Sequence, residues 1–131
     1  MLYLLDTDIC ISVLRGIQPV CDHLIQQEPD NCGVSSVTAF ELYAGARKSA
    51  APARTLGKIE EFLTQVKPLP FDSEAARQAG TIRIQLEALG CPIGPYDLLI
   101  AGHALSLNAT LTTGNLREFS RVTGLRVENW S

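Results

Sequence analysis

The chain has 131 residues, of which 46% are hydrophobic and 19% charged, and these values predict one globular domain over residues 1–131 with a proper core. A net charge of −3 argues against a protein that coats nucleic acid nonspecifically, but it is compatible with an acidic pocket beside a local basic rim. No apolar run reaches the roughly 18 residues of a membrane span, and the first residues lack the basic segment of a signal peptide, so we expect a cytoplasmic protein.

Strands and helices alternate along the predicted chain. Strands are expected at residues 2–5, 32–35, 66–71, 109–113 and 125–128. Helices are expected at residues 8–15, 19–27, 36–49, 53–65, 72–89 and 96–105, and a short one opens at Asn115. Two prolines confine the strand at 66–71 to an edge of the sheet. The alternation predicts a three-layer α/β/α domain around a mostly parallel central sheet.

The cysteines and histidines do not form a recognisable metal motif. No C-x-x-C pair occurs, and neither His23 nor His103 completes a zinc spacing. We therefore expect free, buried thiols at all four cysteines, which are Cys10, Cys21, Cys32 and Cys91. His103 falls within an apolar helical pattern and is expected to be a core histidine with a hydrogen-bond partner.

Two carboxylates follow the first predicted strand. Residues 2–5 are all apolar, as in a strand buried on both faces, and Asp6 comes directly after them. Sites in open α/β sheets form at the carboxyl ends of strands, where Asp6 would lie. A carboxylate there is costly unless it is compensated, and a metal ion is the usual compensation. The alternative is that Asp6 starts a turn, and for Asp8 we favour a role as the cap of the next helix.

Three further acids lie near the starts of helices, and each has a local alternative to a functional role. Glu41 either forms a capping box with Thr38 or faces the pocket where Asp6 emerges. Asp97 either caps its helix or places a favourable charge on the helix dipole, or it belongs to the same pocket. Glu118 could form a capping pair with Asn115.

Taken together, the four acids predict a metal site. Asp6, Glu41, Asp97 and Glu118 are each expected near the carboxyl edge of the sheet, where they would repel one another. A hard divalent cation removes that repulsion, and ligands that are all oxygen select Mg²⁺ or Mn²⁺. Such a site offers a metal-activated water for attack on phosphorus. A nucleotide binder of the P-loop or Rossmann type is excluded because no glycine-rich phosphate loop follows the first strand.

Five segments, in this order and spacing, resemble the PIN-domain family and, within it, the VapC toxins of bacterial toxin–antitoxin pairs. The segments are LDTD at 5–8, SSVTAFEL at 35–42, GPYDLLIAGHA at 94–104, NLREF at 115–119 and GLRVENW at 124–130. The resemblance covers essentially the whole chain.

The resemblance implies a Mg²⁺-dependent endoribonuclease that cuts RNA, typically a tRNA, and arrests translation. It implies that Asp6, Glu41 and Asp97 are the core metal-binding and catalytic acids and that Glu118 is a fourth. It also implies supporting hydrogen bonds from Thr7, Ser36, Thr112 and Asn115. A homodimer and a cognate antitoxin, whose tail blocks the acidic groove, are implied as partners. Candidates for a basic rim that holds phosphates are Arg47, Lys48, Arg54, Arg117 and Arg121.

Two positions depart from the pattern of the family. Position 8 is Asp where many relatives have Asn, and position 114 is Gly where close relatives often carry Asn. Asp8 could be a further ligand through water or only a helix cap, and Gly114 could loosen the turn before Asn115. The alternative to a nuclease is a catalytically weak binding subunit with the same fold.

Overall fold

A five-stranded parallel sheet forms the middle layer of the protein. The computed structural model describes residues 2–131. The strands are β1 (Tyr3–Leu5), β2 (Cys32–Ser35), β3 (Lys67–Leu69), β4 (Thr110–Thr112) and β5 (Arg126–Glu128). Their order across the sheet is β3-β2-β1-β4-β5, and every pairing is parallel. The strand with the proline, β3, lies at an edge as predicted, because Pro68 has no N–H to donate to a further strand.

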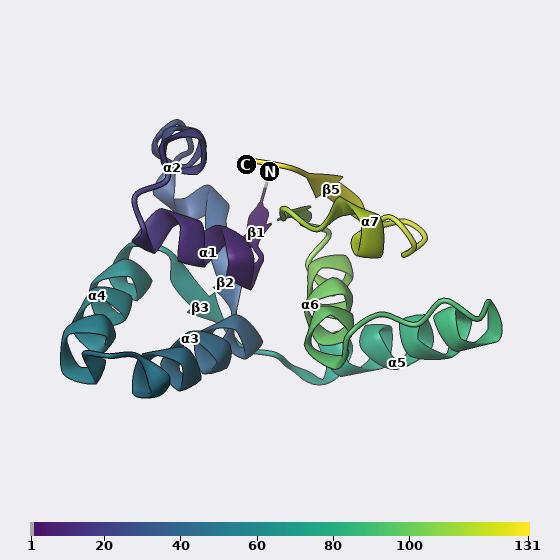
Figure 1. Cartoon of the computed structure of the whole chain (residues 1–131). Coiled ribbons are helices and arrows are strands. Elements are labelled where there is room, and N and C mark those ends of the chain that lie inside the picture. The colour runs from purple at the N-terminus through teal and green to yellow at the C-terminus, as the bar shows by residue number, and fades with distance from the viewer. Residues whose placement is uncertain (1) are drawn as a thin grey trace.

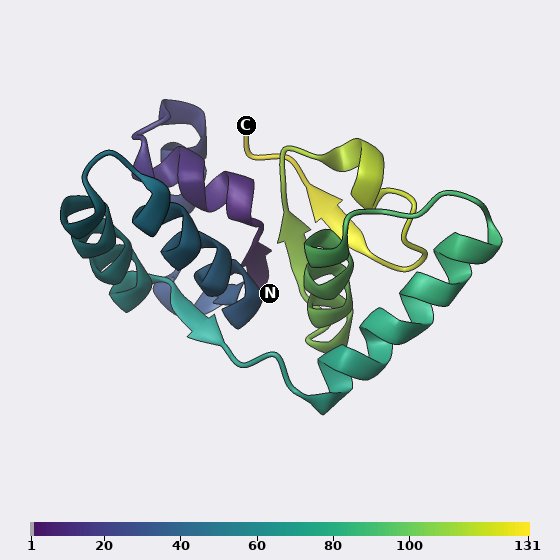
Figure 2. The same cartoon turned by 60° about the horizontal axis from the view of Figure 1, so that its bottom comes forward.

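Helices cover both faces of the sheet, which confirms the predicted three-layer fold (Figures 1 and 2). They are α1 (Thr7–Leu14), α2 (Gln18–Ile25), α3 (Ser36–Lys48), α4 (Pro52–Gln65), α5 (Ser73–Ala88), α6 (Pro95–Ser106) and α7 (Leu116–Phe119), with a short 3₁₀ turn at Pro29–Asn31. Helices α1 to α4 lie on one side, and α5 and α6 pack together on the other (Figure 2). No helix in the described residues is both long and apolar enough to cross a membrane.

The central strand β1 divides the core in two. Leu5 packs into a cluster with side chains of α1 to α4 and the buried Trp130, whereas Leu4 packs into a cluster with side chains of α5 and α6. Both leucines are fully buried, as expected for a strand with apolar residues on both faces. The sheet therefore holds the end of β1 rigidly between two packed layers of helices.

His103 is where the sequence predicted it, and so are two of the four cysteines. His103 is buried in α6, with Nδ1 2.8 Å from Ser35 Oγ and its ring edge-on to Phe71. The pairing with Ser35 confirms a core histidine with a hydrogen-bond partner, and it links α6 to the end of β2. All four cysteines are free thiols, but only Cys10 and Cys32 are buried, whereas Cys21 and Cys91 are partly exposed.

The predicted cap at Asp8 was wrong, and two other caps that the sequence left open are not formed. Helix α1 is capped by Asp6, whose carboxylate accepts from the backbone N–H of Thr7, so Asp8 is not the cap. Helix α3 is capped by Ser35, which places Thr38 inside the helix and excludes the capping box of Thr38 with Glu41. Helix α6 is preceded by Gly94, so the side chain of Asp97 lies in the first turn and does not cap the helix.

Candidate active site

Asp6 lies at the carboxyl end of β1, where its backbone changes from the strand to α1. Its carboxylate is only 4% exposed. Oδ1 accepts a hydrogen bond from the backbone N–H of Thr7 at 2.8 Å, and Oδ2 accepts one from Thr113 Oγ1 at 2.8 Å. The backbone N–H of Asp6 donates to Thr112 O, which ties this position to β4. Asp6 is thus a fixed, buried acid with two of its acceptor sites used.

Glu41 is held beside Asp6 by Thr7. Thr7 Oγ1 donates to Glu41 Oε1 over 2.7 Å and also lies 3.1 Å from Thr38 Oγ1. Thr7 is next to Asp6 in the chain, whereas Glu41 lies in the second turn of α3. The two alternatives for Glu41 are therefore resolved, because its side chain points to the start of α1 and forms no cap.

Asp97 and Glu118 form a second pair of acids. Their side chains hydrogen-bond to one another. Glu118 also accepts from the backbone N–H of Gly94 at 3.1 Å and from Asn115 Nδ2 at 2.5 Å. Asn115 and Glu118 do interact, but through their side chains, since Asn115 makes no side-chain cap to α7. Glu118 thereby joins the start of α7 to the start of α6, where Asp97 lies.

Burial, together with repulsion between the acids, raises the pKa values of two of them. Burial, followed by the charge of Asp8, raises the pKa of Asp6 to about 7. Burial, followed by the hydrogen bond and the charge of Glu118, raises the pKa of Asp97 to about 7. The same hydrogen bond lowers the pKa of Glu118. Glu41 adds to the repulsion at Asp97, so the two pairs of acids share one electrostatic environment.

The raised pKa values predict how the stability of the metal-free protein depends on pH. Asp6 and Asp97 bind a proton more tightly in the folded chain than in the unfolded chain, where an aspartate titrates near 3.8. Their contribution to stability is complete below about pH 4 and is lost as the pH rises through about 7. In thermal unfolding with EDTA, we expect the Tm of the parent to fall between about pH 4 and pH 7 by more than the Tm of Asp97→Asn. Equal slopes for the two proteins would contradict this.

The donors fit a divalent ion that keeps part of its water shell. All the converging side chains offer oxygen, which suits Mg²⁺ or Mn²⁺, and a bound cation would remove the repulsion that raises the two pKa values. Among residues 2–131, no three His, Cys, Asp or Glu side chains already surround one point as a closed metal cage. Mg²⁺ does not need such a cage, because it is usually held by one or two carboxylates and several waters.

The sequence missed Thr113, which is the buried hydroxyl that contacts Asp6. Thr112, predicted to support the pocket, is fully buried, and its Oγ1 has no hydrogen-bond partner within residues 2–131. Thr113 donates to Asp6 and accepts from the backbone N–H of Asn115 at 2.9 Å. Because Leu5 pairs with Thr112, the residues that follow them, Asp6 and Thr113, lie side by side. The sequence alone does not reveal this register. Ser36, also predicted to support the pocket, accepts instead from the backbone N–H of Phe71.

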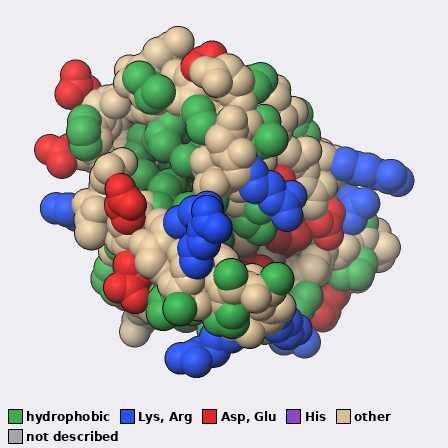
Figure 3. Space-filling view, turned by 60° about the vertical axis from the view of Figure 1, so that its left-hand side comes forward, with side chains coloured by type: hydrophobic (Ala, Val, Ile, Leu, Met, Phe, Trp, Pro, Cys, Tyr) green, Lys and Arg blue, Asp and Glu red, His purple; other side chains and the backbone are tan. Residues whose placement is uncertain are grey.

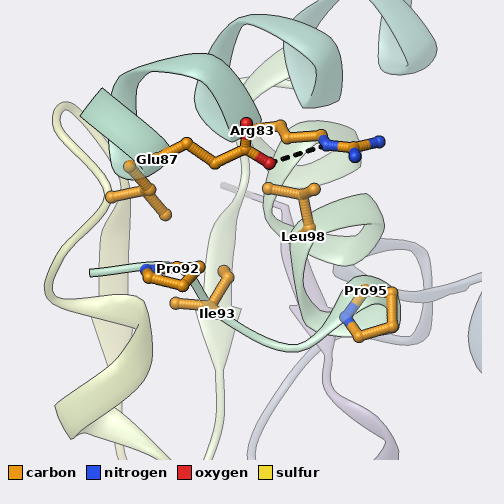
Figure 4. Close-up of a pocket in the computed structure, with 7 residues that line it drawn as sticks. Arg83, Glu87, Pro92, Ile93, Pro95 and Leu98 are labelled. Atoms are coloured by element: carbon orange, nitrogen blue, oxygen red, sulfur yellow. Dashed lines mark hydrogen bonds and ion pairs between the residues drawn. The ribbon is translucent and has the colours of Figure 1, made fainter. Parts of the chain in front are cut away.

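Two of the hollows on the described surface differ in whether one of the four acids lines them. One, of about 340 Å³, runs between α1, α3 and α4 and has Glu41 in its wall, together with Leu14, Leu42 and the basic residues Arg15 and Lys58. Figure 3, which brings this side forward, shows hydrophobic side chains exposed between charged ones. The other, of about 260 Å³, lies between α5 and the loop before α6, and none of the four acids lines it (Figure 4). The first hollow is therefore the one that opens toward the acids.

Comparisons with known proteins identify the family of this chain. A model of the PIN domain matches residues 3–125. The chain belongs to the PIN-domain family. This PIN domain is 40% identical to the tRNA(fMet)-specific endonuclease VapC of Salmonella typhimurium over 128 residues, or 98% of this chain and 97% of that protein. It is 42% identical to the protein of the same name from Shigella flexneri, with 98% of each chain covered. The family resemblance deduced from the five sequence segments is thus confirmed.

Solved structures of related proteins share the whole fold of this PIN domain. The DNA-bound VapBC complex from Salmonella typhimurium contains a chain with a TM-score of 0.95 and 40% identity, with 100% of both chains covered. VapBC2 from Rickettsia felis, bound to a DNA fragment from its promoter, gives a TM-score of 0.94 and 34% identity with the same coverage. Both structures are complexes, so the fold described above is the one that these relatives have when they are bound to a partner protein.

Proposed function

We propose that this PIN domain is a metal-dependent endoribonuclease and the toxin of a toxin–antitoxin pair, and that it hydrolyses phosphodiester bonds of RNA, with a tRNA as the expected substrate. The observation that carries this proposal is the convergence of Asp6, Glu41, Asp97 and Glu118 at the carboxyl edge of one parallel sheet. The names of the relatives, which are endonucleases and ribonucleases, support it.

The four acids have different local environments, which suggests different roles. Asp6 and Asp97 have raised pKa values and would hold Mg²⁺ or Mn²⁺, with Glu41 completing the shell or orienting the attacking water. When bound, the cation supplies positive charge that activates water and neutralises the phosphate in the transition state. Thr7 positions Glu41, and Thr113 positions Asp6. Glu118, held by Gly94 and Asn115, would contact a second ion or a metal-bound water.

The hollow between α1, α3 and α4 is our candidate site for the antitoxin. Its wall combines apolar side chains with Arg15 and Lys58, and it reaches Glu41. An extended or helical segment with apolar anchors and a terminal basic residue would fill the hollow and place its positive charge among the acids. The VapBC complexes of the relatives support a partner protein of this kind.

We also propose that two copies of the chain associate. Phe40 and Tyr96 are both about half exposed, with ring centroids 5.6 Å apart, and they lie beside Glu41 and Asp97 in the chain. A pair of exposed aromatic rings on neighbouring helices is typical of a contact surface. Burying this pair between copies would bring the two acidic pockets near the same interface.

Cleavage of RNA by the purified chain tests the proposed function. The chain is incubated with total tRNA in Mg²⁺, in Mn²⁺ and in EDTA, and the products are separated by size. We expect cleavage with either cation and none in EDTA, and we expect growth arrest when the chain is expressed without a partner. Cleavage that persists in EDTA would contradict the role of the metal. Absence of both cleavage and arrest would favour the alternative, a catalytically weak binding subunit.

A further inference from the structure

One hydrogen bond joins the turn after β4 to the first turn of α1. The backbone N–H of Gly114 donates to Asp8 Oδ2 over 3.0 Å, which connects two exposed segments far apart in the sequence. Position 114 has little room for a side chain, because a Cβ built there would lie 2.9 Å from the same Oδ2 and 3.2 Å from Ser131 Oγ. The carboxylate of Asp8 occupies the space that a side chain at position 114 would take. The two positions that depart from the family pattern are therefore in direct contact.

The turn that Asp8 holds carries two residues of the acidic pocket. Thr113, just before Gly114, donates to Asp6. Asn115, just after it, donates its backbone N–H to Thr113 and its side-chain amide to Glu118. A shift of the turn would therefore move the hydroxyl that supports Asp6 and the amide that supports Glu118 at the same time. Asp8 fixes this turn against the helix that begins at Asp6.

Asp8 also acts on the pocket through its charge. Its negative charge is the largest electrostatic contribution at Asp6 after burial, and it is also felt at Asp97. No positively charged side chain forms an ion pair with Asp8 among the described residues, where the ion pairs are Arg77 with Glu74 and Arg83 with Glu87. A cation bound between Asp6 and Asp97 would therefore also be attracted by Asp8.

We propose that Asp8 is a positioning residue of the metal site, which holds the turn of residues 113–115 in place and adds negative charge that strengthens the binding of a divalent cation. This inference rests on the proposed function, since it concerns the ion that the four acids would hold. Gly114 favours this contact, because a residue without a side chain leaves the carboxylate of Asp8 room on its N–H.

The substitution Asp8→Asn separates charge from geometry. The amide oxygen can still accept from Gly114, but the charge is lost. Thermal unfolding is measured against Mg²⁺ concentration and in EDTA. We expect the Mg²⁺ concentration for half-maximal stabilisation to rise about three- to tenfold, and the Tm in EDTA to rise because a repulsion is removed. A purely structural role for Asp8 would leave the Mg²⁺ dependence unchanged and would not raise the Tm in EDTA. That result would overturn the inference.

A double-mutant cycle tests the contact itself in EDTA, without any metal. Gly114→Ala is made in the parent and in Asp8→Ala. We expect Gly114→Ala to lower the Tm more in the parent, where the added Cβ displaces the carboxylate of Asp8 from the N–H, than in Asp8→Ala, where the carboxylate is absent. Equal losses in the two backgrounds would overturn the inference. If Mg²⁺ does not stabilise even the parent, the proposed metal site fails. If Mg²⁺ stabilises the parent and Asp8→Asn equally, only the role of Asp8 fails.

Discussion

The substitution Asp97→Asn is expected to abolish RNA cleavage and to make the metal-free protein more stable. Activity should fall on the order of 10²- to 10³-fold, as for the loss of one group that stabilises charge in a transition state. Asp97 carries a pKa of about 7 because of burial and Glu118, so its ionised form destabilises the fold at neutral pH. The neutral amide removes that penalty and can still donate to Glu118. After allowance for solvent near this half-buried group, the gain should be about 1 kcal/mol.

Two measurements check this prediction on the same samples. Initial rates of tRNA cleavage are compared in Mg²⁺, and Tm values are compared in EDTA and in Mg²⁺. The parent should gain stability from Mg²⁺, whereas Asp97→Asn should start from a higher Tm and gain little. The matched control is Asp30→Asn, because Asp30 is exposed just before β2, at the amino ends of the strands and away from the four acids. A variant that loses activity and stability together would show that Asp97 has a structural role and does not hold the metal.

Much of the fold could be predicted from the sequence because burial leaves a clear pattern. The apolar residues before Asp6 identified the central strand, and the two prolines placed residues 67–69 at an edge. The apolar pattern around His103 identified a buried helix. Apolar runs and prolines each fit few places in a packed α/β domain, so the residues of each segment were enough to predict its position.

The details of the site could be predicted only in part, because they depend on register and on the choice of cap. Asp8 and Asp6 are both acceptable helix caps in sequence, and the structure uses Asp6, which leaves Asp8 free to hold Gly114. Thr112 and Thr113 are equivalent in sequence, and only the pairing of β1 with β4 decides that Thr113 faces Asp6. A shift of one residue in that pairing would exchange their roles. The four acids could be proposed from the sequence alone, because a cluster of carboxylates without basic neighbours is unusual whatever the register of the strands.

The packing of α5 on α6 positions Asp97, and Gly102→Ala is expected to disrupt it. A Cβ at Gly102 would lie 2.6 Å from Ala79 N and 2.7 Å from Ala79 Cα, both of which are backbone atoms that cannot rotate away. The two helices would have to separate, which should cost about 3 kcal/mol and lower the Tm by roughly 10 °C. Since α6 carries Asp97 in its first turn, cleavage by the folded fraction should fall as well.

The matched control for Gly102→Ala lies on the facing helix, next to Ala79. Gly80 is exposed in α5, and a Cβ built there meets nothing within 4 Å. Gly80→Ala should therefore raise stability by about 0.5–1 kcal/mol, because alanine is the better helix former. Urea unfolding of both variants measures the difference. If Gly102→Ala were as stable as Gly80→Ala, close packing of α5 and α6 at Gly102 would be contradicted. The position of Asp97 would then depend on its hydrogen bond with Glu118 and on the contact between His103 and Ser35.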